Sequence, residues 1–307
     1  MSAATPTTPA AAGPAPARGW LAGLFWVHLL SYAVLPLGLA MRLLYARMLS
    51  VEEYGLFYAA AGLLLLFTGF GDLGLGQAMT HYGLRHRSRG EADGVRRSVV
   101  YALRLQLAST LALSAVLALA AGTIATHAFG APESAAVVYA LIVYFACALP
   151  TRAIANVGLL RDDYLFARLF EPLRLLATLG LAVALVMLDL ASPTTIAVSW
   201  ALASALALGV YLLWYQARFR ALRSVAFEPD PMLVRRIIGY AGPSVLVVMA
   251  STLLVRIDVQ VLAWLSDMTA VAHYENASAI ASLLVAALTP ATLLVFTMAS
   301  QLADEAD

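Results

Sequence analysis

The chain has 307 residues, of which 62% are hydrophobic and 12% are charged, with a formal net charge of +1. Average soluble domains carry about 25% charged residues, so this composition excludes a water-soluble globule and indicates a protein embedded in a lipid bilayer. The nearly balanced charge also gives no reason to expect a nucleic-acid partner.

The chain opens with a tail, residues 1–19, that is rich in Ala, Pro and Thr and has no hydrophobic period. We expect this tail to be disordered. Eight apolar runs follow, each long enough for the roughly 20 helical residues that cross a bilayer and too long for barrel strands. The sequence therefore predicts an all-α polytopic integral membrane protein with about eight transmembrane helices. The predicted spans are 20–45, 54–82, 98–125, 134–158, 164–189, 194–216, 238–265 and 268–299.

The arginines predict the orientation of these spans. All 19 basic residues are arginine, and an N-terminus in the cytoplasm places thirteen of them in inner segments and Arg47 alone in an outer turn. Because cationic loops resist translocation, this split favours cytoplasmic N- and C-termini. The inner arginines are Arg18, Arg85, Arg87, Arg89, Arg96, Arg97, Arg161, Arg168, Arg218, Arg220, Arg223, Arg235 and Arg236.

A faint internal repeat predicts the domain organisation. Shifting the sequence by 216 positions places Leu49-Ser50 on Leu265-Ser266, each at the outer turn of a predicted hairpin. The first helix then matches the seventh, so six helices make one unit and the two units share one orientation in the membrane. We expect four parts: the tail 1–19, a six-helix lobe over 20–217, a cytoplasmic arginine-containing linker over 218–237, and a partial second lobe with a short acidic C-terminus over 238–307.

Charged side chains within the predicted spans are the candidate functional residues, because a charge inside a bilayer costs several kcal/mol unless it is paired or hydrated. Depth, counted at about 1.5 Å per helical residue, sorts them into two layers. The outer half holds Arg42, Arg256, Asp258 and Glu275. The inner half holds Asp72, Arg104, Arg152, Glu171 and Arg174.

In the outer layer, Arg256 and Asp258 are two apart on one helix and point to different sides. Each therefore needs its own partner. We expect Glu275 to meet Arg256, and the repeat sets Arg42 opposite Asp258. A site in a water-filled cavity and an ion pair that only holds helices together both remain open.

In the inner layer, Arg168, Glu171 and Arg174 follow each other at intervals of three on a predicted helix. This spacing lets one carboxylate hold two guanidiniums. The remaining N–H donors could then bind phosphate oxygens, which arginine does in a bidentate manner. Arg104 is better explained as a side chain that extends to the interface.

The chain offers no sign of catalysis or of a bound metal. Residues 69–74 match the letters of a dinucleotide fingerprint, but no strand precedes them, so a helix break beside Asp72 or close helix packing explains them better. The five histidines show no ligand spacing, and the single cysteine, Cys147, excludes a disulfide within the chain. We expect no catalytic residue, no metal and no cofactor.

Two short segments resemble the first hairpin of oligosaccharide flippases in the multidrug/oligosaccharidyl-lipid/polysaccharide exporter superfamily. They are the turn Leu49–Gly55, reading LSVEEYG, and the cluster Gly71–Gly76, reading GDLGLG; the hairpin with Arg256-Ile257-Asp258 adds to the likeness. The resemblance implies two six-helix lobes around a central cavity in the cytoplasmic (inner) membrane. It also implies a transporter, not an enzyme, that flips a polyprenyl-diphosphate-linked oligosaccharide by alternating access for cell-surface polysaccharide biosynthesis.

The resemblance also gives the candidate residues their expected roles. Arg42, Arg152, Arg174 and Arg256 are expected to contact the anionic head group. Asp72, Asp258 and Glu275 are expected to balance charge or couple an ion, and Glu171 to line the same cavity. Since members of this family carry a full second lobe, we expect either a C-terminally truncated chain or a second chain or copy that completes the cavity. The alternatives are a drug/cation antiporter of the same superfamily and a non-transporting structural membrane fragment; a membrane enzyme fits poorly because the outer turns are short.

Overall fold

The computed structural model describes residues 17–224 and 229–283, and within these ranges the chain is helical apart from turns and contains no strand. The helices are α1 (Ala17–Met48), α2 (Val51–Leu66), α3 (Thr68–Asp72), α4 (Leu75–Ser88), α5 (Ala92–His127), α6 (Ala135–Asn156), α7 (Tyr164–Arg168), α8 (Phe170–Met187), α9 (Pro193–Arg218), α10 (Arg220–Ser224) and α11 (Pro231–Leu265), with short 3-10 turns η1 (Pro132–Ser134) and η2 (Val157–Arg161). A further helix, 268–283, follows α11.

The described residues contain six stretches long and apolar enough to cross a membrane, at Val51–Ser88, Ala92–His127, Pro132–Arg161, Phe170–Met187, Pro193–Arg218 and Pro231–Leu265. Their outward faces are apolar: Leu119 is 88% exposed and Leu254 83%. Such faces suit lipid rather than water. The prediction of an all-α polytopic membrane protein is confirmed.

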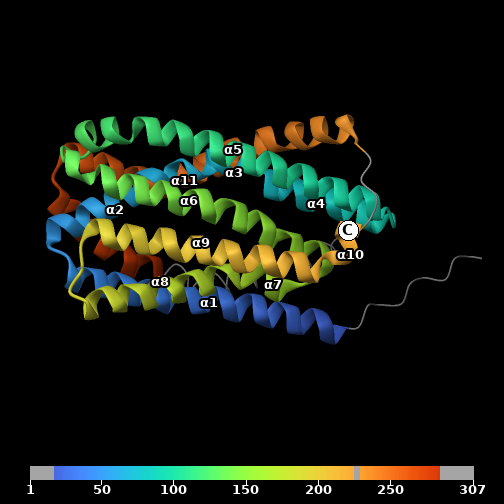
Figure 1. Cartoon of the computed structure of the whole chain (residues 1–307), viewed down its shortest axis with the longest axis horizontal. Helices are drawn as coiled ribbons and strands as arrows, with labels where there is room; N and C mark the ends of the chain where they lie inside the picture. Colours follow the sequence, from blue (N-terminus) through green and yellow to red (C-terminus); the bar gives the residue numbers. More distant parts are fainter. Residues whose placement is uncertain (1–16, 225–228, 284–307) are drawn as a thin grey trace, which may run out of the picture.

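The long helices lie side by side along the longest axis of the molecule (Figure 1). Contacts run in the order α5, α6, α9, α8 and α1, while α4 packs between α5 and α11. The core between α2, α6 and α9 is aromatic: the ring of Trp200 lies 5.2 Å from that of Phe57 and 5.3 Å from that of Tyr144. Such edge-to-face packing adds to the free energy of area burial.

The first two helices meet at a capped turn. The Ser50 hydroxyl accepts a hydrogen bond from the Glu53 amide, and the Glu53 carboxylate accepts one from the Ser50 amide, which makes a capping box at the start of α2. Near this turn, the rings of Tyr45 and Phe57 lie 5.8 Å apart. Beyond it, α1 packs mainly on α8 and α7, and α2 mainly on α11 and α6. The two helices of the predicted hairpin therefore pack against different neighbouring helices.

The predicted span 54–82 is interrupted beside Asp72, as the glycine pattern predicts. Leu73 and Gly74 have φ of 49° and 64°, a left-handed backbone that ends α3 and starts α4. A Cβ on Gly74 would also lie 2.5 Å from the Cβ of Ser244 on α11. Glycine at this position thus allows both the break and the close approach of α11.

The predicted span 164–189 is interrupted as well, at Leu169 between α7 and α8. Asp163 caps the short α7 by accepting a hydrogen bond from the Phe166 amide at 3.3 Å. Pro172, three residues further on, has no N–H for the Arg168 carbonyl, and a proline at this place in the sequence is a signal for such a bend. The bend separates Arg168 on α7 from Glu171 on α8.

Two helices, α1 and α11, begin earlier in the chain than the sequence predicts. α1 begins at Ala17, inside the predicted tail, and the tail residues 1–16 lie outside the described residues. The predicted eighth span is helical over 268–283, and its remaining residues lie outside the described range. α11 begins at Pro231, within the predicted linker, and Asp230 caps it. The division of the chain into two lobes stays a prediction.

The hairpin of α11 and helix 268–283 packs closely on α2. The Gln260 side chain donates to the Ala59 carbonyl at 3.2 Å, and the Tyr54 hydroxyl donates to Asn276 at 2.8 Å. A Cβ on Gly55 would lie 1.8 Å from the Met268 carbonyl oxygen, far inside contact distance. These contacts join α11 and helix 268–283 to α2.

We predict that Gly55→Ala weakens this packing, because the added methyl overlaps a backbone oxygen. The expected loss is about 1 to 3 kcal/mol in the free energy of unfolding. Thermal unfolding of the detergent-purified protein measures it. Gly38→Ala is the matched control, because a Cβ at Gly38 has nothing within 4 Å. Equal unfolding temperatures for the two variants would contradict this packing.

Candidate functional site

A buried carboxylate connects α1, α11 and helix 268–283. The side chain of Glu275 is 1% exposed, and its carboxylate lies 2.8 Å from the Arg42 guanidinium and 3.6 Å from that of Arg256. The same Arg42 nitrogen donates to the Glu275 carbonyl at 2.7 Å, and the guanidinium lies 4.8 Å from the ring centre of Tyr58. We call Arg42, Glu275 and Arg256 the outer cluster.

The predicted pairings of the outer layer are half right. The pair Glu275–Arg256 is confirmed, but the pair Arg42–Asp258 is wrong. Glu275 is buried, so its charge requires compensation more strongly than that of the exposed Asp258. Asp258 instead accepts a hydrogen bond from the Tyr274 hydroxyl.

A second cluster lies among α1, α6, α8 and α9. Arg174 on α8 is 4% exposed, and its guanidinium lies 2.5 Å from the Glu171 carboxylate. It also lies 5.2 Å from the ring centre of Tyr144 and 6.0 Å from that of Trp200. Trp200 in turn donates to the Tyr45 hydroxyl at 2.9 Å. The cluster therefore ties α8 to α6, α9 and α1.

The expectation that Glu171 holds two arginines is wrong for the described residues, where it pairs with Arg174 alone. Arg168 lies on α7, before the bend at Leu169, and its side chain is exposed beside a pocket between α1, α6, α7 and α8. Arg174 also has two nitrogens, Nε and Nη1, with no hydrogen-bond partner in the described part of the chain. Its burial suits a role in positioning Glu171 better than direct contact with a large substrate.

The other inner candidates gather around a pocket between α1, α6, α7 and α8, which we call the inner pocket. It measures about 350 Å³, and both Arg152 and Arg168 line it and are exposed. Arg152 lies close enough to Asp72 and Glu171 to act on both carboxylates electrostatically. Asp72, at the end of α3, and Asn156, at the end of α6, both border Gly76. The full lining is Leu30, Val34, Arg152, Ala155, Asn156, Ala167, Arg168, Phe170 and Glu171.

The arginine-rich segments meet at one end of the bundle. Arg87 donates to the Leu160 carbonyl at 2.8 Å and pairs with Asp162 at 2.5 Å, while Arg218 pairs with Asp163. These contacts join α4, η2 and the end of α9. The segments that the charge pattern assigns to one side of the membrane therefore lie together.

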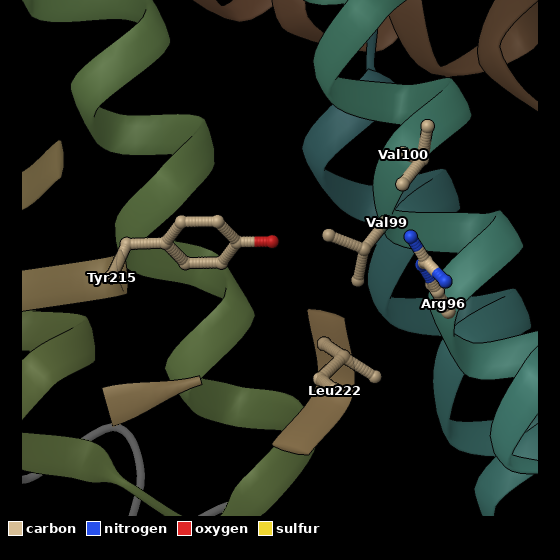
Figure 2. Close-up of a pocket in the computed structure, with 5 residues that line it drawn as sticks. All are labelled: Arg96, Val99, Val100, Tyr215 and Leu222. Atoms are coloured by element: carbon tan, nitrogen blue, oxygen red, sulfur yellow. The ribbon is translucent and has the colours of Figure 1, made fainter. Parts of the chain in front are cut away.

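A smaller, mostly apolar pocket of about 210 Å³ lies at the same end (Figure 2). Arg96, Val99 and Val100 of α5 face Tyr215 and Leu222 across it, and the Tyr215 hydroxyl points toward Val99. Of these residues, the sequence analysis named only Arg96, as an arginine of an inner segment.

Sequence reasoning also missed the aromatic partners of the arginines, Tyr58, Tyr144 and Trp200. Aromatic residues inside predicted spans were the available signal. Which aromatic residue faces which arginine depends on how distant helices are rotated relative to one another. Residue spacing along a single helix does not predict that rotation. Within residues 17–224 and 229–283, no three His, Cys, Asp or Glu side chains come together as a metal site.

Fold and charges define a multi-pass helical membrane protein with ionic clusters inside its spans. The family model described as "Polysaccharide biosynthesis protein" matches residues 20–301. The chain therefore belongs to this family of O-antigen-flippase-like polysaccharide biosynthesis and exporter proteins, which confirms the resemblance read from the turn and glycine motifs. Comparison with curated proteins and with solved structures gave no match.

We predict that Glu275→Gln destabilises the protein, because it leaves two guanidiniums without a counter-ion while preserving side-chain volume. The expected loss is about 2 to 4 kcal/mol, below the top of the range for buried pairs because Arg42 and Arg256 are 21% and 32% exposed. Thermal unfolding in detergent micelles measures it.

Glu133→Gln serves as the control for this prediction. Glu133 is exposed in η1, so its neutralisation should change the free energy of unfolding by less than about 0.5 kcal/mol. If both variants unfold at the wild-type temperature, the outer cluster does not stabilise the fold.

Proposed function

We propose that this chain moves a polyprenyl-diphosphate-linked oligosaccharide from the inner to the outer leaflet of the cytoplasmic membrane, for cell-surface polysaccharide biosynthesis. One observation carries the proposal beyond the family. Arg42 and Arg256 share the buried Glu275, whereas two exposed arginines of the inner pocket, Arg152 and Arg168, have no direct ion pair or hydrogen bond among the described residues, although Arg152 lies near Asp72 and Glu171.

This difference supports an inward-facing arrangement. Unpaired guanidiniums near the arginine-rich end are ready to receive an anionic head group, because arginine binds phosphate oxygens in a bidentate manner. At the other depth, the outer cluster joins α1 to the α11 hairpin and closes that side. The sugar would follow the head group into the space between the two units, while the prenyl chain stays in the bilayer.

Alternating access then requires the outer cluster to separate. Glu275 lies on helix 268–283, and its partners lie on α1 and α11, which the repeat assigns to different units. Opening the outer side pulls Glu275 away from Arg42, and the substrate diphosphate replaces Glu275 as its counter-ion. In this proposal Arg152 contacts the head group early in the transport cycle, and Arg42 and Arg256 contact it late. The carboxylates balance the charge or couple an ion; they are Asp72, Asp258 and Glu275.

The drug/cation antiporter is the second candidate, and the pairing pattern weighs against it. A cationic substrate needs free carboxylates, but Glu171, Asp258 and Glu275 each have a partner. The remaining candidate carboxylate, Asp72, has no ion pair among the described residues, but it lies near the positive charge of Arg152. A purely structural protein is expected to pair its intramembrane charges directly, which Arg152 does not do within the described ranges. We propose further that a second polypeptide or a second copy of the chain contributes to the remaining walls of the cavity.

We predict that the purified protein moves a fluorescent polyprenyl-diphosphate oligosaccharide across proteoliposomes, and that Arg256→Ala slows this at least about tenfold. The reason is that a hydrogen bond to a charged group contributes about 1.5 to 3 kcal/mol, and about 1.4 kcal/mol is a factor of ten. Accessibility of the labelled sugar to an external quencher gives the rate.

Arg47→Ala is the matched control, because Arg47 lies exposed at the end of α1 and outside the cluster. This variant should move the labelled lipid at the wild-type rate. If Arg256→Ala moves the labelled lipid as fast as the wild-type protein, Arg256 is not part of the site. If the wild-type protein exports an organic cation but moves no lipid-linked sugar, the antiporter is favoured.

A further inference from the structure

Two pockets follow one another along the first turns of α5, at the arginine-rich end of the bundle. The larger measures about 430 Å³ and borders Ala92 and Val95 of α5. The smaller, of about 210 Å³, borders Val99 and Val100 one to two turns further on (Figure 2). Leu222 of α10 lines both pockets, so they adjoin. We call the two together the interface groove.

The larger part of the interface groove is cationic, because Arg87 and Arg161 line it. Arg87 pairs with Asp162 at 2.5 Å, whereas Arg161 is exposed and has no ion pair within residues 17–224 and 229–283. Asp162 therefore balances only one of the two arginines. The carboxylates of the neighbouring turn are bound elsewhere, Glu91 to His86 and Asp93 to Arg97.

The smaller part of the groove is mostly apolar and leads to the lipid-facing surface of α5. Val99, Val100 and Leu222 supply aliphatic walls opposite Tyr215 (Figure 2). Spacings of seven and eleven residues place Leu107 and Leu111 on the same face of α5 as Val100. These two leucines are 49% and 56% exposed. A hydrocarbon chain that starts in the groove can therefore continue along apolar side chains of α5.

The groove lies at the depth of lipid head groups. α5 opens the membrane-spanning stretch Ala92–His127, and Tyr215 lies near the end of the stretch Pro193–Arg218. Aromatic residues at such ends are typical of the membrane interface. From Ala92 to Val100 a helix rises about 12 Å, whereas the head-group layer on each side of a bilayer is about 5 to 8 Å deep. A ligand that fills the groove therefore spans the head-group layer and enters the hydrocarbon.

The ligand chemistry combines these parts. Arginine binds phosphate oxygens through its planar fork of N–H donors. Basic pockets between membrane helices bind anionic lipid head groups in this way. Free phosphate matches only the cationic part of the groove, and a lipid without net charge matches the apolar part better than the cationic one. One molecule with both features, an anionic phospholipid, fits the whole groove.

We propose that the interface groove holds one two-chain phospholipid of net negative charge from the surrounding bilayer. Its phosphate lies at Arg87 and Arg161, and one acyl chain runs along Val99 and Val100. None of the residues that line the groove lines the inner pocket or belongs to the outer cluster. The phospholipid is thus a bound partner of the fold and not transported cargo, and the inference does not depend on the proposed function. Because the lipid contacts α4, α5, η2 and α10 together, its binding stabilises their arrangement.

Native mass spectrometry of the full chain in a neutral detergent tests the proposal, because it counts bound lipids as they are titrated. The probes are dioleoylphosphatidylglycerol, which has a net negative charge, and dioleoylphosphatidylcholine, which has none. We expect the first phosphatidylglycerol to bind at least about tenfold more tightly than the first phosphatidylcholine. Equal affinity for the two lipids would overturn the proposal.

Two competitors distinguish the possible sources of the phosphate. Inorganic phosphate in large molar excess should leave the bound phosphatidylglycerol in place, because it lacks the acyl chain. Farnesyl diphosphate, whose single prenyl chain stands for a transported lipid, should also fail to displace it at equal concentration. Displacement by inorganic phosphate would make this a site for a free anion, and displacement by farnesyl diphosphate would make it a site for cargo; either result would overturn the proposal.

Arg161→Gln should weaken phosphatidylglycerol binding about fivefold and leave phosphatidylcholine binding unchanged, since one arginine near an anionic lipid contributes about that factor. Arg161→Lys keeps the charge and should retain the preference for phosphatidylglycerol. Arg85→Gln is the matched control, because Arg85 is an exposed arginine at the same end of the bundle that does not line the groove. Wild-type affinity in Arg161→Gln, or an equal loss in Arg85→Gln, would overturn the assignment of the phosphate to this groove.

A second pair of variants tests the acyl chain. Val100 is only partly buried, so the ring of Val100→Phe can extend into the smaller pocket and should weaken phosphatidylglycerol binding at least about fivefold at an unchanged unfolding temperature. Val116→Phe places the same ring on an exposed part of α5, outside the groove, and should bind as wild type. Wild-type affinity in Val100→Phe would overturn the placement of the chain.

Discussion

The structure depends on one buried negative charge. Glu275 sits almost without solvent contact between Arg42 and Arg256, so the three helices that carry these residues are stable together only while the charges stay close. The close packing of Gly55 against the Met268 backbone and the hydrogen bond between Tyr54 and Asn276 lie in the same region. Ion pairing and close packing thus hold the hairpin of α11 and helix 268–283 against α1 and α2.

At the opposite depth the charges are arranged differently. The segments at the arginine-rich end are joined by the ion pairs of Arg87 and Arg218, yet the inner pocket beside them keeps two exposed arginines without a direct ion pair among the described residues. Arg152 acts on Asp72 and Glu171 only over a longer distance. Glu171 does not neutralise them because it is bound to the buried Arg174. Under the proposed function, these exposed cationic groups receive the anionic head group from one leaflet.

Local patterns predicted the elements and part of the clusters. Hydropathy gave the helical spans, the glycine pattern gave the break beside Asp72, and the hairpin geometry gave the pair Glu275–Arg256, because its members lie on adjacent helices. The pair Arg42–Glu275 joins residues 233 positions apart, and helical period says nothing about which distant helix a side chain faces. The bend at Leu169 has a local cause, because Pro172 in the first turn of α8 has no N–H to bond the Arg168 carbonyl.

The central claim is that the outer cluster separates when the chain handles its substrate. The most direct measurement is the distance between spin labels at Ala46 and His273, both exposed near the outer turns, in a variant without Cys147. Pulsed electron resonance in nanodiscs would record it with and without a polyprenyl-diphosphate oligosaccharide. The account predicts a second, longer distance that appears with the substrate and dominates in Glu275→Gln. A single short distance under all these conditions would contradict it.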